Sequence, residues 1–145
     1  MPVNSTLNRM ETERLRREVL ASAQEVARIH ARIHETLKTR GNSSKDRDIW
    51  ATACKEFHAR YNGLAFPGGY EGAEARIVAG DAESIEAALC FLELRPYFFR
   101  SGYMYQSLLR KMKRAVVTKD QSERLQVVLD RLDEWRLRKA AANAV

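Results

Sequence analysis

The stretch LRREVLASAQEVARIHARIHETL, residues 15–37, decides the fold that the sequence predicts. Its apolar side chains recur at steps of three or four residues, and Ser22 stands in the one place where the pattern lacks an apolar residue. This spacing places them on one face of an α-helix, in a heptad-like pattern of about three repeats. The side chains of this Leu15–Leu37 seam are Leu15, Val19, Val26, Ile29, Ile33 and Leu37.

The residues around the seam predict that this helix is one arm of a hairpin. Asn, Ser and Thr at positions 4–6 offer N-caps, and Gly41–Asn42 offers a stop, so we expect a helix over about residues 6–40. Ser44 is expected to cap a second helix that ends near Tyr61. The short connection between the two favours an antiparallel pair. A homodimeric coiled coil through the seam is the alternative that the heptad-like spacing leaves open.

A connector with many turn residues follows the hairpin. Asn62–Gly69, NGLAFPGG, contains three glycines and a proline, which stop regular structure. Leu64 and Phe66 inside it are expected to pack back onto the core. A short helix is expected over about residues 72–79.

Three further helices are expected over residues 81–140. Asp81 is a predicted N-cap for the first, and Pro96 ends it because proline disfavours helical backbone in the preceding residue. Ser101 is expected to cap the second, which runs to about Val116. Thr118 and Gln121 have the spacing of a capping box that opens the last, which runs to about residue 139. Its predicted apolar face consists of Leu125, Val128, Leu129, Leu132, Trp135 and Leu137.

These segments predict an all-α fold, because no segment of useful length alternates apolar and polar residues with a period of two. We expect a single helical domain over residues 1–145, with a long antiparallel hairpin (6–61), a connector (62–80) and a three-helix unit (81–140). The expected architecture is a helical bundle whose helix–turn–helix order could also stack as helical repeats do.

Composition predicts the class of the protein and the compartment in which we expect it. The 145 residues include 45% hydrophobic and 30% charged residues, which is typical of a globular protein. No run of 18 apolar residues and no secretory signal pattern occurs, so we expect a cytoplasmic protein without a membrane role. Cys54 and Cys90 are expected to be buried thiols in that compartment, and a disulfide between them is the alternative.

One spacing raises the question of a metal site. His30 and His34 are four residues apart on the first helix, and Cys54 and His58 repeat this spacing on the second. An antiparallel hairpin would bring Cys54 level with His30, so a Cys/His₃ zinc site is imaginable. The favoured interpretation is no metal and no cofactor, because structural zinc sites usually show closer ligand pairs.

No motif of an enzyme appears. Neither cysteine stands in a glycine-rich or helix-starting context, and no Gly-x-Ser-x-Gly elbow, phosphate loop or dinucleotide fingerprint occurs. Paired carboxylates lie among basic neighbours, as expected for solvated helix faces. We therefore predict a protein without catalytic activity.

The net charge of +6 is concentrated in residues 95–119, which contain seven basic residues and no acid. On a helical wheel, Tyr105, Leu108, Leu109, Met112 and Val116 share one side of the helix there, and the opposite side carries Arg110, Lys111, Lys113 and Arg114. We call these four cations the Arg110–Arg114 face. It could meet an acidic protein surface or phosphates, or could simply be solvated.

The preceding turn, RPYFFRS at residues 95–101, is interpreted as a structural joint that aromatic side chains fasten, with stacking on bases as the alternative. Arg100 is expected to stack on an aromatic ring or to bond loop carbonyls. The sequence thus predicts a non-catalytic module that binds another protein or itself, and nucleic-acid binding through the Arg110–Arg114 face is the alternative.

Overall fold

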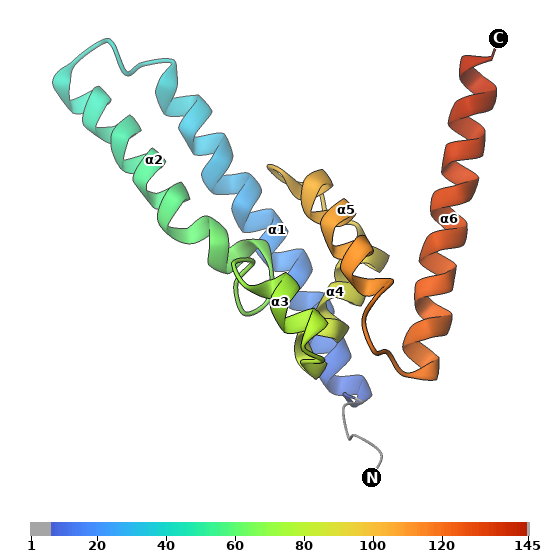
Figure 1. The fold of residues 1–145 in the computed structure, drawn as a ribbon. Coiled ribbons are helices and arrows are strands. Elements are labelled where there is room, and N and C mark those ends of the chain that lie inside the picture. Colours follow the sequence, from blue (N-terminus) through green and yellow to red (C-terminus); the bar gives the residue numbers. More distant parts are fainter. Residues whose placement is uncertain (1–6, 145) are drawn as a thin grey trace.

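A computed structural model describes residues 7–144, and these form six helices and no strand (Figure 1). The predicted all-α fold is therefore confirmed. In chain order the helices are α1 (Arg9–Leu37), α2 (Ser44–Ala65), α3 (Ala73–Val78), α4 (Ala82–Leu94), α5 (Ser101–Met112) and α6 (Lys119–Asn143).

Helices α1 and α2 form the predicted antiparallel hairpin (Figure 1). The side chain of Asn8 accepts a hydrogen bond from the Glu11 amide at 2.9 Å and caps α1, whereas the expected caps at positions 4–6 lie outside the described residues. Ser43, one residue before the predicted Ser44, caps α2 by accepting from the Asp46 amide at 3.0 Å. A polar side chain thus caps the N-terminus of both α1 and α2, as the local sequence favours.

The Leu15–Leu37 seam lies inside this chain's own core. Leu15, Val19, Val26 and Ile29 are buried, Ile33 is partly buried against them, and Leu37 at the hairpin tip is 38% exposed. Helices α2 and α4 pack against α1 and cover the seam. Most residues of the seam are therefore already packed within one chain, and the coiled-coil dimer stays an untested alternative.

Helix α2 continues past its predicted end. It runs through Gly63 to Ala65, and Phe66 then turns inward and is fully buried, with Leu64 partly buried. The turn that follows is held by Arg76, whose Nη2 donates to the Gly69 carbonyl at 2.7 Å. Burial of the following aromatic residue stabilises one more turn of helix than local propensity predicts.

Helix α4 is the centre of the fold and packs against α1, α3, α5 and α6. The run AALCFL at residues 87–92 is buried on every side, as expected for a helix that is apolar all round. Asp81 caps α4 by accepting from the Ser84 amide at 3.0 Å, as predicted. Cys90 is buried in this helix and Cys54 is partly exposed on α2; both are free thiols.

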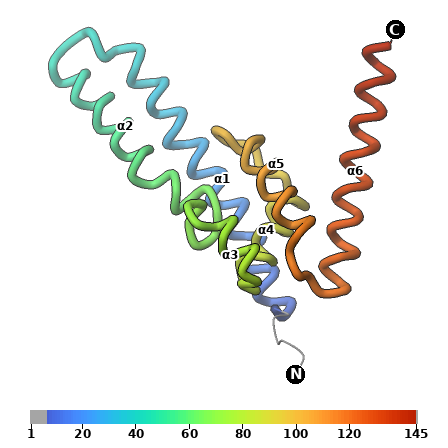
Figure 2. Tube along the Cα trace, viewed as in Figure 1, coloured from blue at the N-terminus to red at the C-terminus, as the bar shows by residue number. Residues whose placement is uncertain are grey.

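Only the first half of α6 belongs to the core. The Thr118–Gln121 capping box is confirmed, and Leu125, Val128 and Leu132 are buried. The predicted apolar face stops there, because Trp135 is 40% exposed and Leu137 is exposed. Figures 1 and 2 show that α6 diverges from the other helices toward its C-terminal end, and it continues to Asn143, beyond the predicted end.

Candidate interaction groove

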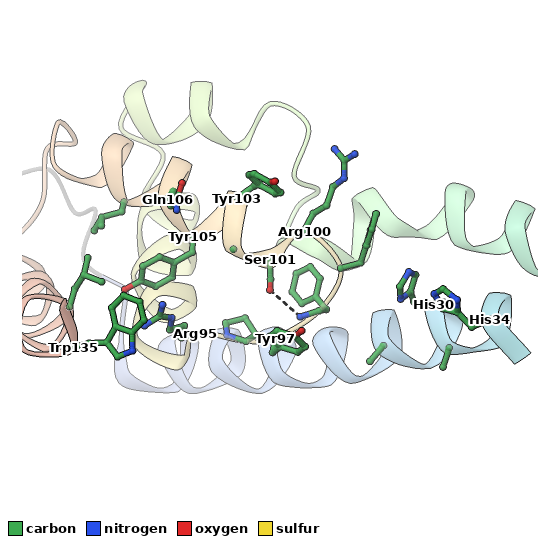
Figure 3. Close-up of a pocket in the computed structure, with 18 of the residues that line it drawn as sticks. His30, His34, Arg95, Tyr97, Arg100, Ser101, Tyr103, Tyr105, Gln106 and Trp135 are labelled. Carbon is green, nitrogen blue, oxygen red and sulfur yellow. Dashed lines mark hydrogen bonds between the residues drawn. The ribbon is translucent and has the colours of Figure 1, made fainter. Parts of the chain in front are cut away.

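A groove of about 1350 Å³ lies where α1, the α4–α5 connection, α5 and α6 meet (Figure 3). His30 and His34 of α1 lie at one end, and Tyr105 and Trp135 lie at the other with Arg95 beside them. We call this the α1–α6 groove. Its walls come from three segments that are far apart in sequence.

Arg95 is positioned in the groove through contacts of both its backbone and its side chain. It caps the C-terminus of α4 in a left-handed conformation with φ 47°, and its amide donates to the Phe91 carbonyl at 2.8 Å. Its guanidinium carbon lies 4.9 Å from the Tyr105 ring centroid and 5.6 Å from that of Trp135. No hydrogen bond or ion pair to any residue in 7–144 engages this guanidinium, so its N–H donors are free for a ligand.

The α4–α5 connection is a structural joint, but not in the predicted manner. Phe98 is buried against Phe91, and the Ser101 hydroxyl accepts from the Phe98 amide at 3.0 Å. Ser101 is therefore the first residue of α5 and bonds the loop, whereas Arg100 occupies the N-cap position with φ 67°. Tyr97 is 94% exposed, which corrects the expectation that all three aromatics fasten the turn.

Phe99 links the turn to α1. Its ring stacks on His30 with centroids 4.8 Å apart, and the Arg100 guanidinium carbon lies 5.5 Å from the same ring centroid. The predicted stacking of Arg100 on an aromatic side chain is confirmed. His30 and Arg100 thus both contact the Phe99 ring, which stays 42% exposed.

The four residues considered as metal ligands do not form one site. The His30 ring lies 4.8 Å from the His34 ring, nearly perpendicular to it, and His58 lies edge-on to Phe57. Burial, and to a smaller degree the neighbouring His34, lowers the pKa of His30. Within residues 7–144, no three His, Cys, Asp or Glu side chains are grouped closely enough to hold a metal ion, and Cys54 does not join the histidines.

The Arg110–Arg114 face lies outside the groove. Helix α5 ends at Met112, so Lys113 is its C-cap and Arg114 follows it. Lys111 is partly exposed and the other three cations are exposed, and none forms an ion pair with a residue of the described chain. Val116, predicted for the apolar side, is exposed because the helix ends before it, whereas Tyr105, Leu108, Leu109 and Met112 are buried as predicted.

The groove is positively charged. Its lining carries four cations but one carboxylate, Glu35. The cations come from the C-cap of α1, from both ends of the α4–α5 connection and from α6, and they are Lys38, Arg95, Arg100 and Arg136. Aromatic faces and free guanidinium donors suit binding of an anionic, partly apolar partner.

Sequence reasoning did not find this groove. The acid-free segment 95–119 was the one indication of the groove, since Arg95 and Arg100 belong to it. The groove residues on α1 and α6 could not be predicted, because tertiary packing brings them to this segment.

Comparison with known proteins gives no match to a protein-family model, a curated protein or a solved structure. None of the helices in residues 7–144 combines the length and apolar character needed to cross a membrane.

Proposed function

We propose that this chain is a non-catalytic, cytoplasmic protein-interaction module that docks a helical segment of another protein in the α1–α6 groove. The observation that carries the proposal is the gathering of Tyr97, Tyr103, Trp135, Arg95 and Arg100 on one concave surface. Trp, Tyr and Arg are the residue types that dominate binding energy at protein interfaces. Most other large apolar side chains of the described chain are buried in the core.

The second half of α6 favours a helical partner. Trp135 follows the last buried residue of that helix, Leu132, and stays 40% exposed in the groove lining, whereas Leu137 lies on nearly the opposite face of the helix. Most helical stability in proteins comes from packing of an apolar face, so a helix laid beside α6 in the groove would bury the Trp135 ring and stabilise α6.

A partner other than a second copy is favoured by charge. The groove is positive, and the chain carries a net charge of +6, so like charges would oppose self-association there. The seam that could have mediated a dimer is buried within the chain.

Nucleic-acid binding is the second candidate function. The observation that favours it is the Arg110–Arg114 face, whose four cations have no ion-pair partner among residues 7–144 and could contact phosphates.

Site-specific photo-crosslinking tests the proposed function. Benzoylphenylalanine is placed at Tyr97 or Tyr103, in the groove, and at Val78, which is exposed on α3 outside it. In cells of the source organism we expect a discrete protein adduct from the groove positions that Val78 does not give and that Trp135→Ala abolishes. Equal adducts at all three positions, no adduct, or only nuclease-sensitive adducts would overturn the proposal, and the last result would favour the nucleic-acid alternative.

A further inference from the structure

We infer that Arg95 is a carboxylate anchor, and that the segment docked in the α1–α6 groove is an acidic amphipathic helix of another protein. This inference rests on the proposed function and adds the chemistry of the partner. It assigns a binding role to Arg95, whose other role is to cap the C-terminus of α4.

The backbone at Arg95 gives the first argument. Within residues 7–144, Arg95 and Arg100 are the two non-glycine residues with positive φ, and both line the groove. A left-handed conformation costs a non-glycine residue about 1–2 kcal/mol, so glycine would satisfy either position more easily. The contribution of arginine here must therefore come from its side chain.

The aromatic contacts give the second argument. Tyr105 and Trp135 both lie within stacking distance of the Arg95 guanidinium and restrict its orientation. A guanidinium held by aromatic faces keeps its N–H edges open, and their fork geometry matches a carboxylate in a bidentate pair. Because the side chain is already ordered, less conformational entropy is lost on binding.

The surrounding charge gives the third argument. Lys139 Nζ lies 5.0 Å from the Trp135 ring centroid, and Arg136 lines the same end of the groove. Arg136 is also 3.9 Å from Asp133, a long contact between two exposed side chains that neutralises it only weakly. Arg95, Arg136 and Lys139 thus make this end of the groove complementary to several carboxylates rather than to one.

The aromatic rings beside Arg95 favour a peptide over single-stranded nucleic acid as the source of the anion at this end of the groove. Base binding needs free aromatic faces. At this end Trp135 is already contacted by Arg95 and Lys139, and Tyr105 is 8% exposed, so these two rings offer little stacking surface, whereas the exposed rings of Tyr97 and Tyr103 lie elsewhere in the groove. Apolar side chains of a helix need no flat ring face and can pack on the exposed parts of Trp135 and Phe99.

Selection of peptides by the full chain tests the inference. A random library of peptides of about 16 residues, enough for about four helical turns, is selected against the wild type, against Arg95→Asn and against Arg114→Gln. Asparagine tolerates the left-handed backbone, so the first variant removes the cation with little strain, and the second is a control outside the groove. Circular dichroism confirms that each variant is folded.

Binding is then read at the groove itself. A Trp50→Phe background leaves Trp135 as the one tryptophan, because the chain contains two. We expect the selected peptides to be enriched in Asp and Glu at helical spacing with apolar residues and to change the Trp135 fluorescence. Arg95→Asn should weaken the best peptide about tenfold or more, and Arg114→Gln should not. Replacing that peptide's acidic residues by Gln or Asn should cause a similar loss that is not additive with Arg95→Asn.

The outcomes separate this inference from the proposed function. Peptides that change Trp135 fluorescence but are neutral or basic, or that bind Arg95→Asn as well as the wild type, would overturn the carboxylate anchor and leave the docking groove intact. If no peptide is enriched, or none changes Trp135 fluorescence, both proposals are overturned. A dT₂₀ oligonucleotide that changes Trp135 fluorescence where peptides do not would replace both with nucleic-acid binding.

Discussion

Arg124 on α6 forms an interior ion pair with Glu86 on α4, with its Nη1 2.9 Å from Oε2 and 3.0 Å from Oε1 of the carboxylate. Glu86 is 2% exposed, and it also accepts hydrogen bonds from the Thr12 hydroxyl at 2.7 Å and the Gln121 side-chain amide at 3.0 Å. One carboxylate thus ties α1, α4 and α6 together. The orientation of α6, and with it the α6 wall of the groove, depends on this contact.

Glu86→Ala is expected to lower the free energy of unfolding by about 3 kcal/mol, near the lower end of what removing one partner from a buried ion pair costs. The loss is moderated because Arg124 keeps its pair with Glu93 at 2.7 Å. Urea denaturation measures it. Asp133→Ala is the matched control: it removes an exposed pair with Arg136, and we expect less than about 0.5 kcal/mol. Equal losses in the two variants would contradict the role assigned to Glu86.

The same carboxylate predicts a pH dependence. Burial raises the pKa of Glu86, but hydrogen bonds from Thr12, Gln121 and Arg124 outweigh it and hold the pKa below its ordinary value of 4.5. A lowered folded-state pKa stabilises the fold fully above the unfolded-state value, and this contribution is lost as the pH falls through the folded-state pKa. We therefore expect the wild type to lose more unfolding free energy than Glu86→Gln between about pH 6 and pH 3.

Unfolding of both proteins across this pH range, monitored by circular dichroism, gives the comparison. Hydrogen bonds from Arg28 and Arg60 lower the pKa of Glu25 to about 2, but this residue is the same in both proteins, so its effect cancels in the difference. Parallel pH profiles would show that Glu86 does not titrate as inferred.

The buried seam predicts a contrast along α1. Ile29→Ala should lower the unfolding free energy by about 2–5 kcal/mol because it leaves a cavity in the core, whereas Leu37→Ala should lower it by less than about 1 kcal/mol. The denaturation midpoints should not change with protein concentration. A midpoint that rises with concentration in the wild type, and less in Ile29→Ala, would favour the dimer interpretation.

The left-handed end of α4 predicts that Arg95→Gly is more stable than Arg95→Ala by about 1 kcal/mol. Both variants lose the contacts with Tyr105 and Trp135, so the difference reports the backbone conformation alone. Urea denaturation of the pair measures it. If alanine is equal to or better than glycine, residue 95 does not adopt this conformation in solution.

The sequence by itself determined the helices and the buried face of the hairpin. The period of the Leu15–Leu37 seam, the cap at Asp81 and the Thr118–Gln121 capping box act over one or two helical turns, and each is found where it was predicted. Errors of one to a few residues, as at Ser43 and Ala65, arose where a neighbouring residue offered an equal cap or where tertiary burial extended a helix.

Only the tertiary structure decided where a partner could bind. Local periodicity could not show that Glu86 and Arg124 join α4 to α6, or that α6 leaves the core after Leu132, because both depend on contacts between distant segments. The same contacts bring Arg95 and Trp135 together, 40 positions apart in the chain. The sequence indicated that residues 95–119 are basic, and packing decided that two arginines of that segment face a groove while Arg110–Arg114 do not.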